Sequence, residues 1–383
     1  MTGKAGKAGL HGQILKPEDL ACILDGACFL GSGGGGPYSV GQQLLKYIGS
    51  RPVSLVQPGS VPNTGWMAVS AFVGSPDAAA GQQLNFKVAS TAYQALASRT
   101  KTTFQYVLPG EVGAGNTLVP MAVSADLNLP VVDGAGACRA IPGLLMCTYA
   151  AAKIPITPMI LGDSKTQCSA ECPNAVADPL VRGIISGGVF DEDAGIAFWK
   201  MNGQTMRSAV VSGMTSQALK TGKALAEARR NGKDPVTAVR QSLWHPNYLL
   251  CTGTIKESSE TTSGGFDFGT VVIQDDNGSE VTLYNQNENL IAFRNNSPMP
   301  LAIGPDMLCY LTTDGKPFSN ADLSSVGKHQ KVVVIGVAAT QQMRDPFIIN
   351  QFLDALAGIG YAGGYVPIER LQPQSSRRRG RKP

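Results

Sequence analysis

The spacing of apolar residues changes along this chain, and that change limits the fold more than any other feature of the sequence. Up to about residue 170, short apolar runs alternate with segments in which apolar residues recur at helical spacing. The apolar runs lie at residues 66–73, 104–108, 129–132 and 157–161. Such alternation is typical of an α/β layer with a mixed, largely parallel sheet. From about residue 251 the apolar positions recur every second residue, which indicates a β-rich second half.

Capping and turn residues locate the helices and one hairpin. Pro17, followed by two acidic residues, predicts a helix start, because proline suits the first turn and acids favour the positive end of the helix dipole. Asn277-Gly278 between two apolar runs predicts a β-hairpin. Further helices are expected over residues 40–48, 87–98, 215–230 and 346–358, with another beginning at Pro235, and further strands over 308–312 and 332–337.

A segment rich in breaking residues, 168–179, marks the expected boundary between two domains. We expect an α/β domain over residues 16–170 and a β-rich domain over residues 171–371. Residues 1–15 are expected to be flexible, and residues 372–383 to form a basic disordered tail. The chain of 383 residues is long enough to bury a core in both domains.

The net charge of +4 comes from this tail, which holds five of the basic residues. Without those five, 27 basic residues face 28 acidic ones, so the folded body is expected to be nearly neutral and to lack a nucleic-acid-binding face. The tail itself is open to three interpretations: a nucleic-acid contact, a nuclear address or a solvated extension, of which we favour the last.

Membrane insertion is not expected, because no apolar stretch reaches the roughly 18 residues that a membrane-spanning helix needs. The eight cysteines stand mostly within apolar runs, which favours buried, reduced thiols over a disulfide framework. The sequence therefore predicts a cytoplasmic protein that binds a small molecule, with a homo-oligomer left open.

A glycine-rich segment at residues 31–36 formally fits the G-x-G-x-x-G pattern. Dinucleotide sites need a strand before the first glycine, whereas a helix is predicted here, and a P-loop would need a following lysine. The remaining functional interpretation is that backbone N–H groups converge on an anion or a polarised carbonyl. These N–H groups belong to Gly33, Gly34, Gly35 and Gly36. The alternative is a tight turn that packs two elements closely.

Two further glycine-rich loops, 109–116 and 133–142, each follow a predicted strand. In parallel sheets such loops share one edge, where ligands bind. Glu111 and Asp133 are therefore candidate catalytic carboxylates, and Asn116 and Arg139 are candidate substrate-binding residues. The alternative is that Asp133 caps a helix and pairs with Arg139.

Metal and nucleophile signals are weak. The three histidines, at positions 11, 245 and 329, do not have metal-ligand spacing, and Cys168 and Cys172 have no matching second pair. A divalent metal remains possible without support from histidine spacing, and no other cofactor is predicted. The G-x-S-x-G pattern of the α/β-hydrolases does not occur.

Several motifs, in this order along residues 18–370, together resemble the S-methyl thiohydantoin desulfurase domain family. They are Leu30-Gly31-Ser32-Gly33-Gly34-Gly35-Gly36, Val131-Val132-Asp133-x-x-Gly136-x-x-Arg139-Ala140-x-Pro142, Gly264-Gly265-Phe266, Asn287-Glu288-Asn289-Leu290-Ile291-Ala292 and Pro305-Asp306. The resemblance implies an α/β N-terminal domain and a β-rich C-terminal domain. This chain carries Ala135, Cys138 and Gly143 where the family has Asp, Gly and Glu.

The resemblance implies that the protein would act as a hydrolase of a small five-membered cyclic amide or thioimidate, such as an S-methyl thiohydantoin or a hydantoin. Water would attack the ring carbon, Glu111 or Asp133 would accept its proton, and Arg139 would anchor a substrate carboxylate. Glu288 would approach the substrate from the second domain, unless its segment is a polar hairpin turn. With two family carboxylates missing, a noncatalytic small-molecule binder or regulatory protein is the alternative.

Overall fold

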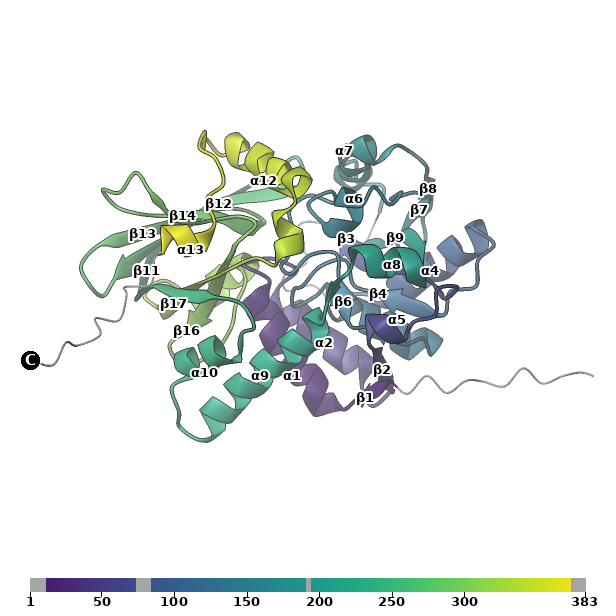
Figure 1. Cartoon of the computed structure of the whole chain (residues 1–383), viewed down its shortest axis with the longest axis horizontal. Coiled ribbons are helices and arrows are strands. Elements are labelled where there is room, and N and C mark those ends of the chain that lie inside the picture. Colours follow the sequence, from purple (N-terminus) through teal and green to yellow (C-terminus); the bar gives the residue numbers. More distant parts are fainter. Residues whose placement is uncertain (1–11, 74–83, 191–193, 373–383) are drawn as a thin grey trace, which may run out of the picture.

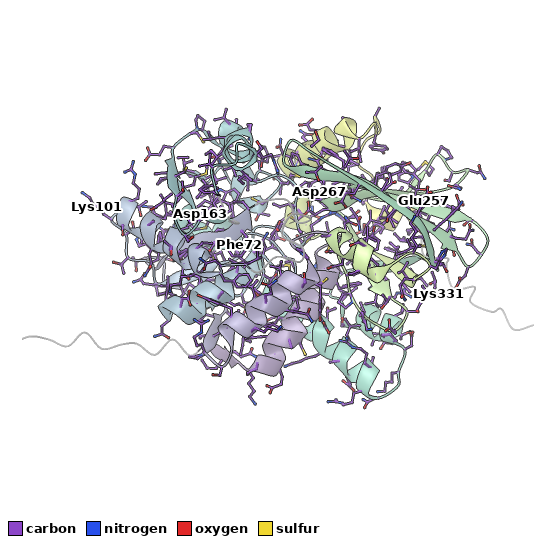
Figure 2. All side chains as sticks on the ribbon, turned by 180° about the vertical axis from the view of Figure 1, so that it is seen from behind. Phe72, Lys101, Asp163, Glu257, Asp267 and Lys331 are labelled. Carbon is purple, nitrogen blue, oxygen red and sulfur yellow. The ribbon has the colours of Figure 1, made fainter. Side chains whose placement is uncertain are left out.

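The computed structural model describes residues 12–73, 84–190 and 194–372, which form two lobes, each built on one large sheet (Figure 1). The basic tail and residues 1–11 therefore lie outside the described residues. Gln13–Leu15, within the segment expected to be flexible, form strand β1. Seen from the opposite side, Phe72 and Asp163 lie in one lobe, and Glu257 and Lys331 lie in the other (Figure 2).

The first sheet has eight strands in the order β1-β2-β5-β4-β3-β9-β7-β8. Their bounds are Gln13–Leu15 (β1), Val53–Val56 (β2), Trp66–Val73 (β3), Tyr106–Leu108 (β4), Val131–Val132 (β5), Met159–Gly162 (β7), Gln167–Ala170 (β8) and Ala194–Asn202 (β9). The expected mixed sheet is confirmed, but its parallel part is smaller than expected. The three neighbouring pairs of its β2-β5-β4-β3 part are parallel, and the other four pairs are antiparallel. Strand β9, which follows the expected boundary at residue 170, also belongs to this sheet.

Helices surround the first sheet, and the predicted ones occur close to their expected bounds. The helices that precede the second sheet in the chain are α1 (Pro17–Leu30), α2 (Tyr38–Ile48), α4 (Lys87–Arg99), α5 (Val119–Leu127), α6 (Thr148–Ala151), α7 (Asn174–Ser186), α8 (Gly203–Ala209), α9 (Met214–Arg230) and α10 (Pro235–Ser242). Of these, α5, α6, α7 and α8 were not predicted from the sequence. A short antiparallel pair joins β6 (Gly134–Ala135) to β10 (Val211–Ser212).

The second sheet is antiparallel and curved, with seven strands in the order β15-β14-β13-β12-β11-β17-β16. The bounds are Asn247–Ser263 (β11), Phe266–Asp275 (β12), Glu280–Gln286 (β13), Glu288–Arg294 (β14), Pro300–Ile303 (β15), Met307–Thr312 (β16) and Lys331–Val337 (β17). Helix α11 (Leu323–Val326) lies between β16 and β17, and helices α12 (Pro346–Gly358) and α13 (Ile368–Leu371) follow β17. The Asn277-Gly278 turn joins β12 to β13 as predicted.

One cluster of buried apolar side chains runs from the first sheet into the second lobe, where Ile303 and Phe352 belong to it. The two sheets therefore share part of their core. The eight cysteines are free thiols. Among the described helices, none is long and apolar enough to cross a membrane.

Candidate functional site

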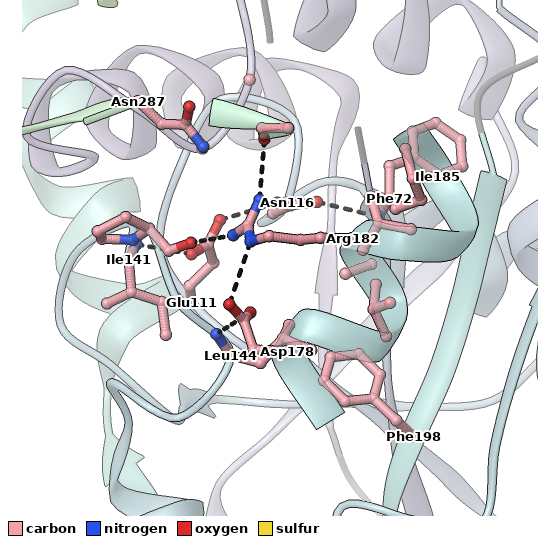
Figure 3. Close-up of a pocket in the computed structure, with 18 of the residues that line it drawn as sticks. Phe72, Glu111, Asn116, Ile141, Leu144, Asp178, Arg182, Ile185, Phe198 and Asn287 are labelled. Carbon is pink, nitrogen blue, oxygen red and sulfur yellow. Dashed lines mark hydrogen bonds and ion pairs between the residues drawn. The ribbon is translucent and has the colours of Figure 1, made fainter. Parts of the chain in front are cut away.

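A cavity of about 120 Å³ lies where the glycine-rich segment, the loop after β4, helix α7 and two segments of the second lobe meet (Figure 3). A single water needs roughly 10–15 Å³ on this measure, so the cavity has room for a small ligand. The residues lining it are Gly35, Gly36, Ala71, Phe72, Val73, Gly110, Glu111, Asn116, Ile141, Pro142, Leu144, Asp178, Val181, Arg182, Ile185, Phe198, Trp199, Gly265, Asn287 and Glu288.

Glu111 follows β4 and projects its carboxyl group to the cavity wall. One carboxyl oxygen accepts a hydrogen bond from Asn116 Nδ2 at 2.8 Å, and the other accepts one from the Ile141 N–H at 2.8 Å. Burial raises the pKa of Glu111 to about 7, although these two donors and the Arg139 charge act in the opposite direction. Desolvation disfavours a buried carboxylate, so this carboxyl can hold or release a proton near neutral pH.

Glu288 opens β14 in the second lobe and reaches the same cavity. Its side chain packs against Gly34, and only 3% of the residue is exposed. Burial, followed by the charge of Glu111, raises the pKa of Glu288 to about 8. Its Oε2 atom is buried without a hydrogen-bond partner. Buried polar atoms are normally paired, so an unpaired carboxyl oxygen in a cavity wall points to a ligand contact.

The two carboxyl groups influence each other because like charges in a shared, poorly hydrated site resist simultaneous ionisation. Glu111 comes from the first lobe and Glu288 from the second. Near neutral pH the pair therefore retains about one proton, so that one group can accept a proton while the other donates one. The structure brings together two of the carboxylates that the sequence singled out.

Only part of the glycine-rich segment lines the cavity, and the rest packs against other residues. Gly35 and Gly36 line the cavity, whereas Gly33 packs against Asn289 and Asn320. The Gly34 N–H donates to the Gly31 carbonyl at 3.1 Å, and the Gly35 N–H acts as a donor to the Glu288 carboxyl. These two N–H groups are thus engaged within the protein rather than directed at a ligand.

Asn116 lies between the cavity and the first sheet. Its Oδ1 accepts the Phe72 N–H at 3.1 Å, while its Nδ2 donates to Glu111. Because both ends of the amide are held, Asn116 fixes the orientation of the Glu111 carboxyl.

Asp133 does not line this cavity, contrary to its expected place beside Glu111. It is fully buried and accepts hydrogen bonds from Gln57 Nε2 at 2.8 Å and from the N–H and hydroxyl of Ser216, at 3.0 and 2.5 Å. These contacts tie β5 to the first turn of α9. The alternative interpretation from the sequence, a carboxylate at a helix start, matches this geometry, although its partner there is not Arg139.

Arg139 is also absent from the cavity wall. It is fully buried, and its guanidinium donates to the carbonyls of Ala140, Asp306 and Asn289 at 2.9, 2.9 and 2.7 Å. All three nitrogens are therefore engaged with main-chain oxygens, two of them in the second lobe. The expected contact with a substrate carboxylate is replaced by a contact between domains.

Asp178, Arg182 and Trp199 are among the cavity residues that sequence reasoning missed. Asp178 and Arg182 stand four residues apart on α7, a spacing that could have indicated an ion pair on a helix face. Trp199 carried no signal, because its place depends on an irregularity of β9. There the register against β3 shifts, so that Trp199 and Lys200 face a single residue, Ala68.

This bulge explains how two neighbouring side chains, Phe198 and Trp199, both reach the cavity, since residues of a regular strand alternate between faces. Trp199 has a φ of +44°, a strained conformation for an aromatic residue. Its indole Nε1–H is buried without a hydrogen-bond partner. Strain and an unpaired donor at one cavity-lining residue are features of binding sites.

Comparison with known families assigns the chain to one of them. The family model described as "S-Me-THD-like, N-terminal domain" matches residues 18–170, and "S-Me-THD-like, C-terminal domain" matches residues 173–353. The chain belongs to the S-Me-THD-like family. The resemblance found in the motifs is thereby confirmed, together with the two-domain organisation.

A solved structure of similar fold is the crystal structure of a protein from Chromobacterium violaceum, which is 31% identical in sequence, with a TM-score of 0.80. The similarity covers 93% of this chain and all of that one. No curated protein matches this chain.

The S-Me-THD-like fold also places the departures from the family motif. Ala135 and Gly143, which depart from the family motif, are outside the cavity lining, whereas Glu111 and Glu288 lie within it. Cys138 likewise lies outside the lining, and burial raises the pKa of its thiol. In the described part of the chain, no group of three or more His, Cys, Asp or Glu side chains is arranged to hold a metal ion.

Proposed function

We propose that this S-Me-THD-like protein hydrolyses a small five-membered cyclic thioimidate or amide, such as an S-methyl thiohydantoin, with Glu111 and Glu288 as its acid–base pair. The observation that carries this proposal is the meeting of these two carboxyl groups, from different lobes, at one cavity, with both pKa values raised toward neutrality. Positioned groups with such pKa values suit proton transfer in both directions at neutral pH.

The reaction needs two proton transfers in each half. Water adds to the ring carbon that bears sulfur, ionised Glu111 accepts the water proton, and protonated Glu288 gives its proton to the ring nitrogen. The resulting tetrahedral carbon then collapses to a carbonyl. Glu288 takes the hydroxyl proton, methanethiolate leaves with the C–S electrons, and Glu111 protonates it. The products are a hydantoin and methanethiol, and both carboxyl groups return to their starting state.

The test measures thiol release and ring opening on a panel of S-methyl thiohydantoins and hydantoins across pH 5 to 10. We expect a bell-shaped profile, because both the fully protonated and the fully ionised pair are inactive. Glu111→Gln and Glu288→Gln should each lower kcat by about 10²-fold or more and flatten one limb. Glu227→Gln, an exposed carboxylate on α9, is the matched control.

The competing function is that of a noncatalytic binder descended from the same family. Saturable binding of these rings without turnover at any pH would favour it and would contradict the hydrolase proposal. Turnover that survives in both Gln variants would move the catalytic groups elsewhere.

A further inference from the structure

The described part of the cavity lining contains three acidic side chains and one cationic side chain, and the cationic side chain already has protein partners. Arg182 is the single cationic side chain among the described residues that line the cavity. Its Nε donates to Asp178 Oδ2 at 3.1 Å, and one terminal nitrogen donates to the Gly265 carbonyl at 2.8 Å. The other terminal nitrogen donates to the Pro142 carbonyl (Figure 3).

The face of the guanidinium is occupied too. Arg182 Cζ lies 3.3 Å from the centroid of the Phe266 ring, at the tip of the β11–β12 hairpin. Arg182 thus connects α7, the loop at Pro142 and the second lobe, and every nitrogen has a protein partner. A carboxylate or phosphate on a ligand would have to displace one of them.

Asp178 is the partner that removes the charge. Its Oδ2 accepts from Arg182, and its Oδ1 accepts the Leu144 N–H at 3.0 Å, so its orientation is fixed from two sides. Both members of the pair are largely shielded, with about a fifth of each side chain exposed (20% and 23%). The ion pair therefore presents no net charge to the cavity. Glu111 and Glu288 have no ion-pair partner among the described residues that line the cavity, and the buried Arg139 charge acts on them from outside the lining.

We infer that Asp178 determines ligand charge: by neutralising Arg182 it makes the cavity favour uncharged ligands over those that carry a carboxylate. An anion would meet the carboxyl pair without a free cation to balance it, and like charges brought together weaken binding. The remaining wall is largely apolar and aromatic, with Phe72, Phe198 and Trp199, which suits a flat uncharged ring. For the identity of that ring, the inference rests on the proposed function.

The experiment compares two hydantoins that differ only in charge, hydantoin-5-acetamide and hydantoin-5-acetate, by calorimetric titration. We expect wild-type protein to bind the amide at least about tenfold more tightly than the acetate. Asp178→Asn keeps the Leu144 contact but leaves the Arg182 charge unbalanced, so it should bind the acetate about tenfold more tightly than wild type does. Affinity for the amide should change less than about threefold.

Two further variants show whether the gain acts through Arg182. Asp178→Asn combined with Arg182→Gln should restore the preference for the amide, because the released cation is gone. Glu171→Gln, which breaks the exposed ion pair with Arg99, should leave the preference unchanged. Equal binding of both hydantoins by wild type, or an unchanged preference in folded Asp178→Asn, would overturn the inference.

A second readout separates this inference from the proposed function. If wild type binds neither hydantoin, the ring assignment is wrong, and fluorescence quenching of Trp199 decides the charge selectivity. In a Trp66→Phe/Trp244→Phe background, acrylamide should quench Trp199 more than iodide does, and Asp178→Asn should raise iodide quenching alone. Iodide quenching that does not respond to Asp178→Asn would contradict the inference.

Discussion

Glu111 and Glu288 show how two ordinary side chains acquire unusual acidity from their surroundings. Each has lost most of its contact with water, and each lies within the electrostatic influence of the other. Asn116 and the Ile141 N–H stabilise the charged form of Glu111, whereas Glu288 keeps one oxygen unpaired. Glu288 is therefore the less favourable of the two places for a negative charge.

Glu288→Gln should stabilise the protein at alkaline pH. The folded pKa of Glu288, about 8, lies above its ordinary value, 4.5, so the stability linked to its proton is present below pH 4.5 and is lost as the pH rises through about 8. A pKa difference of one corresponds to about 1.4 kcal/mol, so the variant should gain a few kcal/mol at pH 9 relative to wild type. Denaturation with urea at pH 4 and pH 9 measures this. An equal effect at both values would contradict it.

At the scale of elements, the β9 bulge and the glycine-rich segment shape the cavity wall. The bulge turns Trp199 toward the wall beside Phe198. Gly35 has a φ of +76° and accepts the N–H groups of Gly115 and Asn116 on its carbonyl at 2.8 and 3.2 Å. The segment is thus a close contact between two loops, which was the alternative interpretation from the sequence.

Gly35→Ala should be strongly destabilising. A Cβ atom would lie 2.5 Å from the Gly113 Cα, where only backbone could move, and alanine does not favour the positive φ. We expect a loss of about 2–4 kcal/mol, from overpacking together with backbone strain. Gly183→Ala is the control, because α7 has open space there, and it should be neutral or stabilising by up to about 1 kcal/mol. Thermal melts compare the two; similar melting temperatures would argue against the close contact.

At the scale of the whole molecule, the cavity exists because two lobes meet. Glu288 and Asn287 come from the second lobe, and Arg139 fixes that lobe by donating to the carbonyls of Asn289 and Asp306. Asp306 in turn accepts from Ala339 and from other groups near the C-terminal helix. Arg139 thus affects the site by fixing the position of the second lobe against the first.

Arg139→Met should destabilise the protein by about 3–5 kcal/mol, because it leaves buried carbonyls without their charged donor. Arg139→Lys, which keeps the charge but not the three-way contact, should lose less. Arg99→Met, at an exposed ion pair, should change stability by less than about 1 kcal/mol. Urea denaturation of the three variants would refute the bridging role if Arg139→Met were as stable as wild type.

Interactions between residues close in sequence determine many of the helices, turns and strands of this protein, independently of any contact between the lobes. The helix start at Pro17, the hairpin at Asn277-Gly278 and the period-two strands after residue 251 depend on neighbouring residues, so their signals are complete within the sequence. Resemblance to family motifs identified the family and pointed to Glu288, and the position of Glu111 after a predicted strand pointed to the other cavity carboxylate.

Tertiary structure decided the roles of the remaining residues, because burial, charge coupling and partner identity depend on segments that are distant in sequence. Asp133 and Glu111 are both carboxylates that follow predicted strands. Asp133 nevertheless accepts hydrogen bonds from Ser216 and Gln57, whereas Glu111 faces a cavity. Asp178 lies at the site because it is on α7, a helix that follows the expected domain boundary. Trp199 lies there because of the bulge in β9. Neither the position of that helix nor the irregularity of that strand follows from local propensity, since each is fixed by packing against the rest of the fold.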